Sequence, residues 1–118
     1  MPTARPTEIR LKRAEKILEL TFDDGSAYRL PAELLRVESP SAEVQGHSPE
    51  QRQLVAGAAQ VGILRLEPVG NYAIRIVFDD GHDTGLFTWS YLNELGRDQD
   101  TRWQKYLAAM KQAGLSRE

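Results

Sequence analysis

Cysteine is missing from all 118 residues of the chain. Its absence excludes disulfide bonds, zinc sites built from thiolates, cysteine-ligated clusters and thiol nucleophiles. An excess of positive charge is also missing, because 15 Lys and Arg stand against 17 Asp and Glu and give a formal net charge of −2. That balance argues against a strongly basic nucleic-acid-binding protein.

The chain also has no long hydrophobic run. No stretch approaches the roughly 20 apolar residues that a helix needs to cross a bilayer, and residues 1–10 lack the apolar centre of a signal peptide. We therefore expect a cytoplasmic protein that binds neither a membrane nor nucleic acid. Its 41% hydrophobic and 27% charged residues are typical of one globular domain with a modest core.

One sequence pattern occurs twice, 56 residues apart. In residues 17–30 and 73–86, apolar residues alternate with polar ones, then Asp-Asp-Gly follows, and then a second short run. The alternation predicts a strand with one buried face, and Asp-Gly favours a tight turn because glycine accepts positive φ. Each segment is therefore predicted to be a β-hairpin, and the repetition indicates an internal duplication.

The predicted fold class is α+β. Two duplicated hairpin units form small antiparallel sheets, each preceded by a further strand (around residues 9–12 and 64–67) and followed by a short helix (31–36 and 90–95, the second stopping at Gly96). A C-terminal helix begins at a cap formed by Asp100 and ends at Gly114. We assign residues 1–6 to a tail, 7–97 to the domain and 98–118 to the C-terminal helix and tail.

Alternation within the strands also predicts which side chains are buried. The expected core consists of Leu18, Leu20, Phe22, Leu30, Ile74, Ile76, Phe78, Leu86 and Trp89.

Residues 38–62 lie between the two halves, and the first part of this segment, residues 39–49, has the composition of a turn. For residues 50–60 the composition leaves a weak helical turn and a loop both open.

Motifs that would carry catalysis are scarce. The sequence has no phosphate-binding Gly-x-x-x-x-Gly-Lys loop, no His-Glu-x-x-His pair and no Gly-x-Ser-x-Gly turn. The Asp pairs at 23–24 and 79–80 resemble paired carboxylates, but their place in repeated hairpin turns favours a structural role. We predict no catalytic residue.

Metal binding has few candidate ligands. The two histidines are His47, in the segment between the repeats, and His82, which is followed by Asp83. These three side chains are the candidates for a weak divalent-cation site, assembled across distant segments. The alternative is that His82 orders the turn after Gly81, and we expect no metal and no cofactor.

The predicted last helix offers a candidate surface for binding a partner protein. Trp103, Tyr106, Leu107 and Met110 fall on one face of the predicted last helix. That face either docks with a partner or covers the sheet of its own domain. The partner-binding candidates are Trp103, Tyr106 and Met110 of the helix, with Ser39, Ser41 and His47 of the preceding loop. The sequence does not indicate the oligomeric state.

Residues 66–92 carry a more specific pattern, with Asp-Gly-His at 80–82 and Trp-Ser-Tyr-Leu at 89–92. This stretch resembles the gamma-butyrobetaine hydroxylase-like N-terminal domain family, and the resemblance extends over roughly residues 7–97. The family is similar to the N-terminal domain of the carnitine-synthesis dioxygenases and also occurs fused to P-loop iron–sulfur carrier ATPases.

In the dioxygenases this domain holds zinc through three cysteines and one histidine. The resemblance places the histidine at His82 and the cysteine positions at Ser39, Ser41 and Val44, which implies that the family's zinc site is lost here. The oxygenase catalytic domain would need a far longer chain, so the resemblance does not imply an enzyme.

Two hypotheses about function follow. The first is a non-catalytic binding or accessory module, linked by the family's fusions to iron–sulfur or cofactor-protein maturation. The second is a small metal-binding protein that uses His82, His47 and carboxylates.

Overall fold

The two repeated hairpins belong to two separate three-stranded antiparallel sheets. The structure is a computed structural model, described here for residues 4–40 and 54–118. The first sheet has the order β1 (Pro6–Lys12), β2 (Ile17–Phe22), β3 (Ala27–Pro31), and the second has the order β4 (Ile63–Val69), β5 (Ala73–Phe78), β6 (Leu86–Thr88). The α+β prediction with two small antiparallel sheets is confirmed, and β1 begins one residue inside the expected tail.

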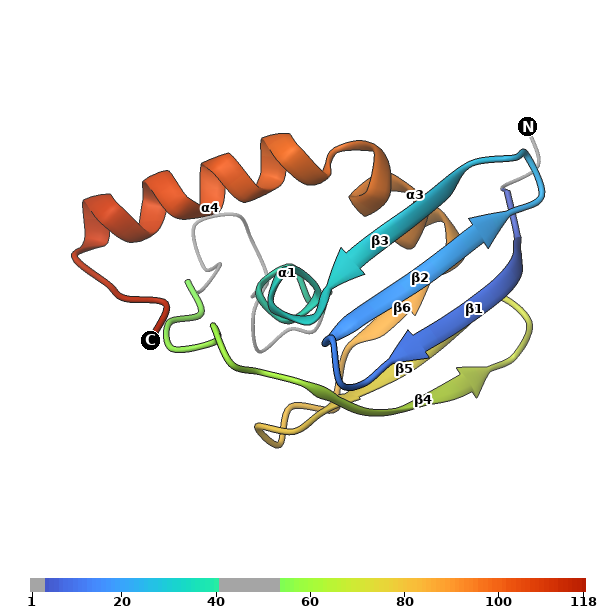
Figure 1. Ribbon diagram of the computed structural model, residues 1–118, viewed down its shortest axis with the longest axis horizontal. Coiled ribbons are helices and arrows are strands. Elements are labelled where there is room, and N and C mark those ends of the chain that lie inside the picture. Colours follow the sequence, from blue (N-terminus) through green and yellow to red (C-terminus); the bar gives the residue numbers. More distant parts are fainter. Residues whose placement is uncertain (1–3, 41–53) are drawn as a thin grey trace.

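The helices follow the sheets in the chain. Helix α1 (Ala32–Val37) comes directly after β3, and α3 (Trp89–Arg97) comes directly after β6. Helix α4 (Gln99–Ala113) ends the regular structure. Figure 1 shows the first sheet in front of the second, with α1 at one end of the front sheet and α4 beside α1. None of the helices in the described ranges has the length and apolar character needed to cross a membrane.

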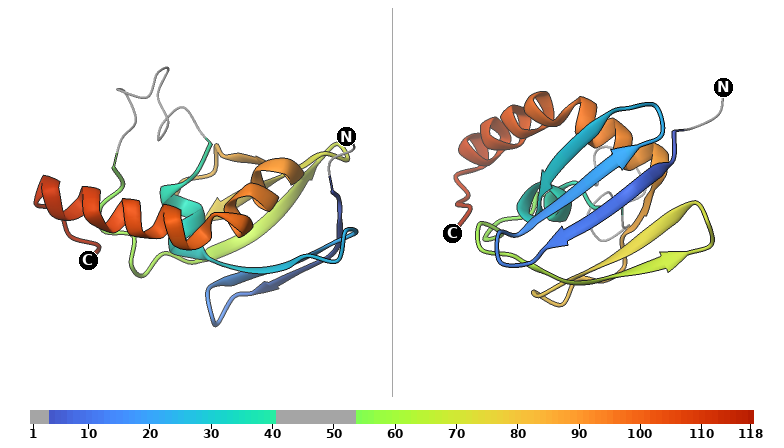
Figure 2. Two further views of the ribbon diagram at one scale, coloured as in Figure 1. Left: turned by 90° about the horizontal axis from the view of Figure 1, so that it is seen from above. Right: turned by 45° about the vertical axis from the view of Figure 1, so that its right-hand side comes forward.

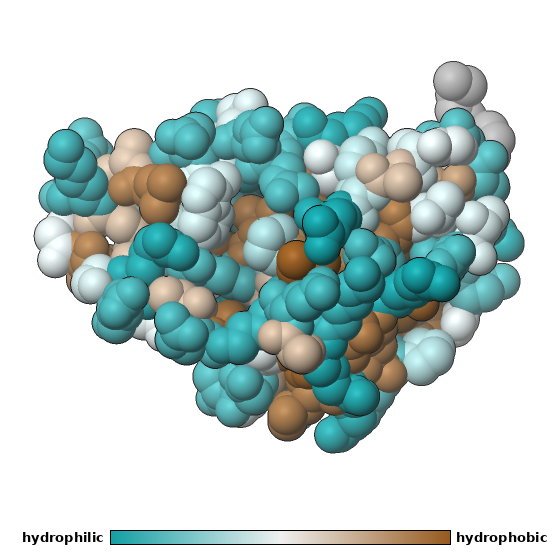
Figure 3. Space-filling view, viewed as in Figure 1, coloured by the Kyte–Doolittle hydropathy of each residue, from teal (hydrophilic) through white to brown (hydrophobic). Residues whose placement is uncertain are grey.

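In the middle strand of each sheet, the alternating sequence pattern determines which side chains face the core. Leu18, Leu20 and Phe22 of β2 are at most 1% exposed and face the core. Glu19, between them, faces outward and forms ion pairs with Lys12 and Arg29 of the neighbouring strands. Strand β5 buries the matching positions in the same way. Hydrophilic residues accordingly cover much of the face that the first sheet presents in Figure 3.

One core lies between the two sheets and the helices. Its largest fully buried side chains come from both sheets and from α1 and α3: Phe22, Phe78, Phe87, Leu18, Leu20, Leu30, Leu34, Leu35, Ile76, Leu92, Leu95 and Val37. Tyr106 and Met110 of α4 join the same cluster. A single shared core means that the duplicated units stabilise each other, and Figure 2 shows their two sheets lying one over the other.

The prediction that Leu86 is buried is wrong. Leu86 is 42% exposed, and its neighbour Phe87 is fully buried. In the first sheet Leu18 pairs with Leu30, whereas in the second sheet Ile74 pairs with Phe87. The second hairpin therefore holds one more residue between its turn and its last strand. Because side chains alternate between faces, one extra residue moves the whole strand to the opposite face. Trp89, also predicted to be buried, is half-buried.

Two predicted helix ends also differ. Helix α4 begins at Gln99, so Asp100 lies in its first turn and Asp98 occupies the cap position. Asp100 still suits that place, because a carboxylate near a helix N-terminus interacts favourably with the helix dipole. Helix α3 continues through Gly96, where a Cβ atom would lie 2.3 Å from the Tyr28 ring. Gly114 does end α4, with a φ of 68° that glycine adopts readily.

The described part of the segment between the repeats, residues 54–62, contains no helix. Its chain is fixed instead by single hydrogen bonds to other elements. Lys16 Nζ donates to the Gln60 carbonyl at 2.8 Å, and Tyr106 Oη donates to the Val55 carbonyl at 2.6 Å. Helix α4 thus packs on residues 54–62 and beside α1. One of the two alternatives from the sequence was that this helix covers the sheet of its own domain.

Candidate functional site

Ser39 and His82, far apart in the sequence, meet where the two repeats join. Ser39 follows the end of α1, and His82 follows the turn after β5. The Ser39 Oγ and His82 Nε2 atoms lie 2.9 Å apart, and both side chains are buried. The backbone of His82 also closes its turn, because its N–H donates to the Asp80 carboxylate and its carbonyl accepts from the Phe78 N–H.

Neighbouring contacts hold this junction together. The Arg36 guanidinium of α1 forms a 2.7 Å ion pair with Asp80, and the Phe78 ring lies 5.9 Å from the His82 ring. At Gly85 a Cβ atom would lie 2.4 Å from Ser39 Oγ, so glycine is what lets the two segments approach. The junction therefore joins α1 of the first unit to the turn of the second through side chains that are largely out of water.

The side chains at this junction do not fit a thiolate zinc site. Structural zinc takes about four ligands, usually cysteine and histidine. The family resemblance puts the first cysteine at Ser39, which offers a hydroxyl instead, and that hydroxyl is hydrogen-bonded to His82. Within residues 4–40 and 54–118, no group of three or more His, Cys, Asp or Glu side chains is placed to hold a metal ion.

Several candidate residues stay apart from the junction or outside the described residues. Asp83 is exposed, and no described hydrogen bond or ion pair joins it to His82. Ser41, Val44 and His47 lie outside the described residues, so their predicted roles stay predictions.

The α4 candidates have two different environments. Tyr106 and Met110 are 5% and 3% exposed and belong to the common core. In this conformation neither side chain is accessible to a partner. Trp103 is half-buried, and its ring packs against the Tyr106 ring with centroids 5.3 Å apart. Of the three, Trp103 is the one that reaches the surface.

Trp103 lies in a groove between α1 and α4. The groove has a volume of about 320 Å³ and is lined by Pro31, Glu33, Leu34, Gln99, Asp100, Trp103 and Arg117. The Arg117 guanidinium lies over the Trp103 ring at 5.3 Å and binds both carboxylate oxygens of Glu33, at 2.8 and 2.7 Å. Hydrogen bonding to Glu33 raises the pKa of Arg117 above its ordinary value.

Sequence reasoning missed both Glu33 and Arg117. Glu33 has the sequence context of a polar residue on a short helix, yet its side chain is only 9% exposed. Arg117 stands 84 residues further on, in a segment without a motif. No local signal joins them, because the contact exists only once α4 is packed beside α1.

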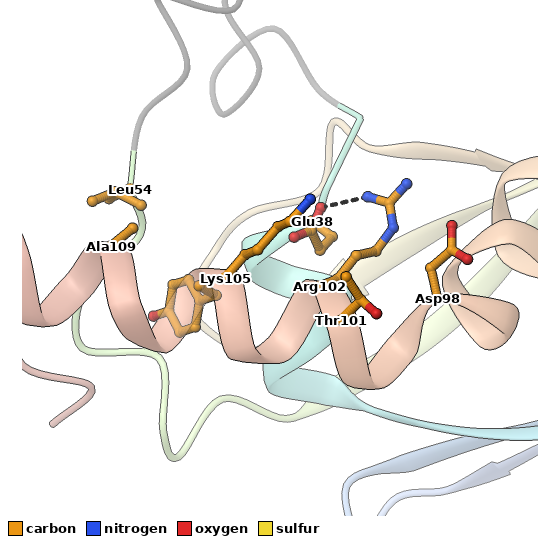
Figure 4. A pocket seen from close by; sticks show the side chains of 8 residues that line it. Glu38, Leu54, Asp98, Thr101, Arg102, Lys105 and Ala109 are labelled. Atoms are coloured by element: carbon orange, nitrogen blue, oxygen red, sulfur yellow. Dashed lines mark hydrogen bonds and ion pairs between the residues drawn. The ribbon is translucent and has the colours of Figure 1, made fainter.

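A second, larger pocket opens on the other side of α4. It has a volume of about 620 Å³, and its walls carry charges of both signs (Figure 4). Arg102 binds the buried Glu38 carboxylate at 2.9 Å and also reaches Glu94 at 3.1 Å, while Lys105 and Asp98 also line the pocket. These walls suit a polar ligand.

Known proteins resemble this chain over most of its length. Residues 9–93 match the model of the family described as "Gamma-butyrobetaine hydroxylase-like, N-terminal". The chain belongs to this family. The matched part is the N-terminal part of the hydroxylase-like proteins and not their catalytic domain. Among curated proteins, no match was found.

Solved structures agree with the assignment. Two NMR solution structures share 49% and 47% sequence identity with the chain, with TM-scores of 0.86 and 0.85. They cover 99% and 100% of this chain, and the chain covers 92% and 90% of theirs. A crystal structure from Acidithiobacillus ferrooxidans, of a DUF971-family protein with unknown function, has 40% identity and a TM-score of 0.66 over 78% of this chain and 92% of its own. The family resemblance inferred from residues 66–92 is thereby confirmed.

Proposed function

We propose that this family member is a non-catalytic accessory module that binds another protein through the groove between α1 and α4. The observation that carries the proposal is the position of Trp103. A large aromatic side chain, half-exposed in a concave and partly apolar groove, is the kind of residue on which protein interfaces concentrate their binding energy.

The chemistry around Trp103 supports a protein partner. Apolar walls from Pro31 and Leu34 lie next to a charged pair, Glu33 and Arg117. A small interface commonly combines such an apolar centre with a polar rim. The family's fusions to iron–sulfur carrier ATPases support placing the partner among proteins that mature iron–sulfur or other cofactor proteins.

A site-specific cross-link tests the proposal. The photoreactive residue p-benzoylphenylalanine replaces Trp103 in one variant and Tyr72 in a matched control. Tyr72 is 53% exposed and lies in the turn between β4 and β5, outside the residues that line the groove. Illumination in the native cell is expected to give a discrete cross-linked species from position 103 and none from position 72.

The captured protein is then purified and titrated against the chain. Trp103→Ala is expected to weaken binding at least about tenfold, as for a central aromatic interface residue, and Tyr72→Ala to leave it unchanged. Dispersed amide NMR spectra confirm that both variants are folded. Equal binding by the Trp103→Ala variant, or cross-linking from position 72 alone, would overturn the proposal.

A further inference from the structure

One wall of the groove between α1 and α4 is formed by Arg117, which belongs to the segment that follows α4. After Gly114 ends α4, residues 115–118 turn back under the helix and reach residues 54–62, as Figure 1 shows at the left of the molecule. The turn is fixed by the Leu115 N–H, which donates to the Met110 carbonyl at 2.9 Å. The way in which this segment is bound shows what the groove recognises.

Part of the recognition is through the backbone. The Gly57 N–H donates to the Ser116 carbonyl and the Ala59 N–H donates to the Arg117 carbonyl, each at 2.9 Å. Gly57 has a φ of 72°, a conformation that other residues rarely adopt. Residues 57–59 thus present two backbone donors to the neighbouring carbonyls of Ser116 and Arg117, and these hydrogen bonds do not depend on the side chains of the bound segment.

The rest of the recognition is specific for arginine. Arg117 donates through Nε and Nη2 to the two oxygens of Glu33, and its flat guanidinium covers the Trp103 ring at 5.3 Å. Both contacts use the planar fork of arginine, which lysine lacks. The Glu33 side chain is 9% exposed, and a carboxylate so far out of water needs a cation beside it.

The bound segment is nevertheless held lightly. Residues 111–118 are all exposed, and the Arg117 side chain is 46% exposed. Leu115, its largest apolar side chain, is 43% exposed and adds little burial. Because few apolar contacts hold this segment, it can leave the groove without unfolding the domain, and its release is opposed mainly by loss of the ion pair between Arg117 and Glu33.

We propose that the groove binds a short segment of a partner protein that carries an arginine, and that residues 115–118 compete for the same contacts as an internal segment. The inference rests on the proposed function and identifies the chemistry of its partner. The partner's arginine takes the place of Arg117 between Glu33 and Trp103, and its backbone takes the two N–H groups of residues 57–59.

The test uses the full chain with the groove opened by Arg117→Ala. The probe is an acetylated hexapeptide with the sequence Ala-Gly-Leu-Ser-Arg-Glu, which repeats residues 113–118, and the matched peptides carry alanine or lysine in place of arginine. Binding is followed by NMR at the Gly57 and Ala59 amides and at the indole of Trp103. The indole of Trp89, which donates to the Asn71 carbonyl, serves as the internal control.

The arginine peptide is expected to shift the first three signals and leave the Trp89 indole in place. The alanine peptide should bind at least about tenfold more weakly, since it loses a hydrogen-bonded ion pair, and the lysine peptide should fall between the two. The unaltered chain should bind the arginine peptide about tenfold more weakly than Arg117→Ala, because its own segment competes at millimolar effective concentration. Adding Glu33→Gln to the Arg117→Ala chain should remove the preference for arginine.

Arg117→Lys provides a second test chain if Arg117→Ala does not fold, since it keeps a cation beside Glu33 but lacks the planar fork that binds both carboxylate oxygens. The same order of peptide affinities is expected for it. Equal affinity for the three peptides, or no shift at millimolar peptide, would overturn the inference. A dimer of the unaltered chain that Arg117→Ala abolishes would also overturn it, because the occupant would then be a second copy.

The outcome is separable from that of the proposed function. If the cross-linked partner still depends on Trp103 but no peptide binds, the binding module stands and the arginine recognition falls. If the arginine peptide binds but Trp103→Ala leaves partner binding unchanged, the proposed function falls while the peptide chemistry of the groove stands.

Discussion

The Oγ atom of Ser39 lies 2.9 Å from Nε2 of His82, and this contact joins the end of the first repeat to the turn of the second. Both side chains are buried, so water does not compete for the hydrogen bond between them. The family resemblance puts a thiolate and its histidine at these two positions. Here a hydrogen bond connects them instead.

Loss of that hydroxyl should destabilise the fold. Ser39→Ala leaves a buried histidine nitrogen without this partner, which costs about 1–3 kcal/mol of unfolding free energy. Urea denaturation measures the loss. Ser90→Ala is the control, because its hydroxyl is exposed and bonded only to Thr88 among the described contacts, and it should change stability by less than about 0.5 kcal/mol. Equal effects of the two substitutions would mean that the junction contributes no stability.

Folding should not depend on metal. The hydroxyl at Ser39 is a poor zinc ligand, and stable structural zinc would contribute on the order of 10 kcal/mol to folding. We therefore expect the same melting temperature with and without a chelator, and no stoichiometric metal by elemental analysis of protein purified without an affinity tag. One equivalent of zinc or iron that is lost in His82→Ala would contradict this expectation and favour the metal-binding hypothesis.

The register of β6 predicts opposite effects of substitutions at two neighbouring residues, Phe87 and Leu86. Phe87→Ala removes a fully buried ring and should cost about 3–5 kcal/mol, as should Phe78→Ala in β5. Leu86→Ala, one residue away and 42% exposed, should change the free energy of unfolding by less than about 0.5 kcal/mol. Chemical denaturation of the three variants measures the difference. A larger loss for Leu86→Ala than for Phe87→Ala would show that the strand has the opposite register.

Stability should fall in alkaline solution through Tyr106. Burial raises the pKa of Tyr106 above its ordinary value of 10.0, and the charge of Glu33 adds to the rise. The folded state therefore holds the phenol proton more tightly than the unfolded state does. Its contribution is complete below about pH 10 and is lost as the pH rises through the higher pKa of the folded state.

Tyr106→Phe isolates this effect. At neutral pH the variant should be about 1 kcal/mol less stable, because it loses the hydrogen bond to the Val55 carbonyl. The gap from the unaltered chain should narrow above about pH 10. Tyr72→Phe, at an exposed tyrosine, is the control and should follow the unaltered chain at every pH. Parallel curves for Tyr106→Phe and the unaltered chain would contradict the assignment.

Strand β5 buries Ala73 and Val77 as well as the three expected positions, so its burial does not alternate. The hairpins, the alternating burial in β2 and the end of α4 at Gly114 were all predictable from the sequence. Each depends on residues a few positions apart: the period of two along a strand, the Asp-Gly turn and the glycine with positive φ. The same local reasoning failed at Leu86, where the position of one extra residue between Asp83 and Leu86 decides which face of β6 is buried. Composition does not reveal that position.

The sequence by itself determined two duplicated sheet units with one buried face each, because strand periodicity and turn chemistry act between near neighbours. Tertiary structure decided the rest. It set Ser39 against His82, turned Tyr106 and Met110 into the core, and closed Arg117 over Glu33 and Trp103. The contact of Ser39 with His82 and that of Glu33 with Arg117 join residues 43 and 84 positions apart, and both form only when the two sheets and α4 pack around a common core. Such packing is set by the summed fit of many side chains, and no short stretch of sequence contains it.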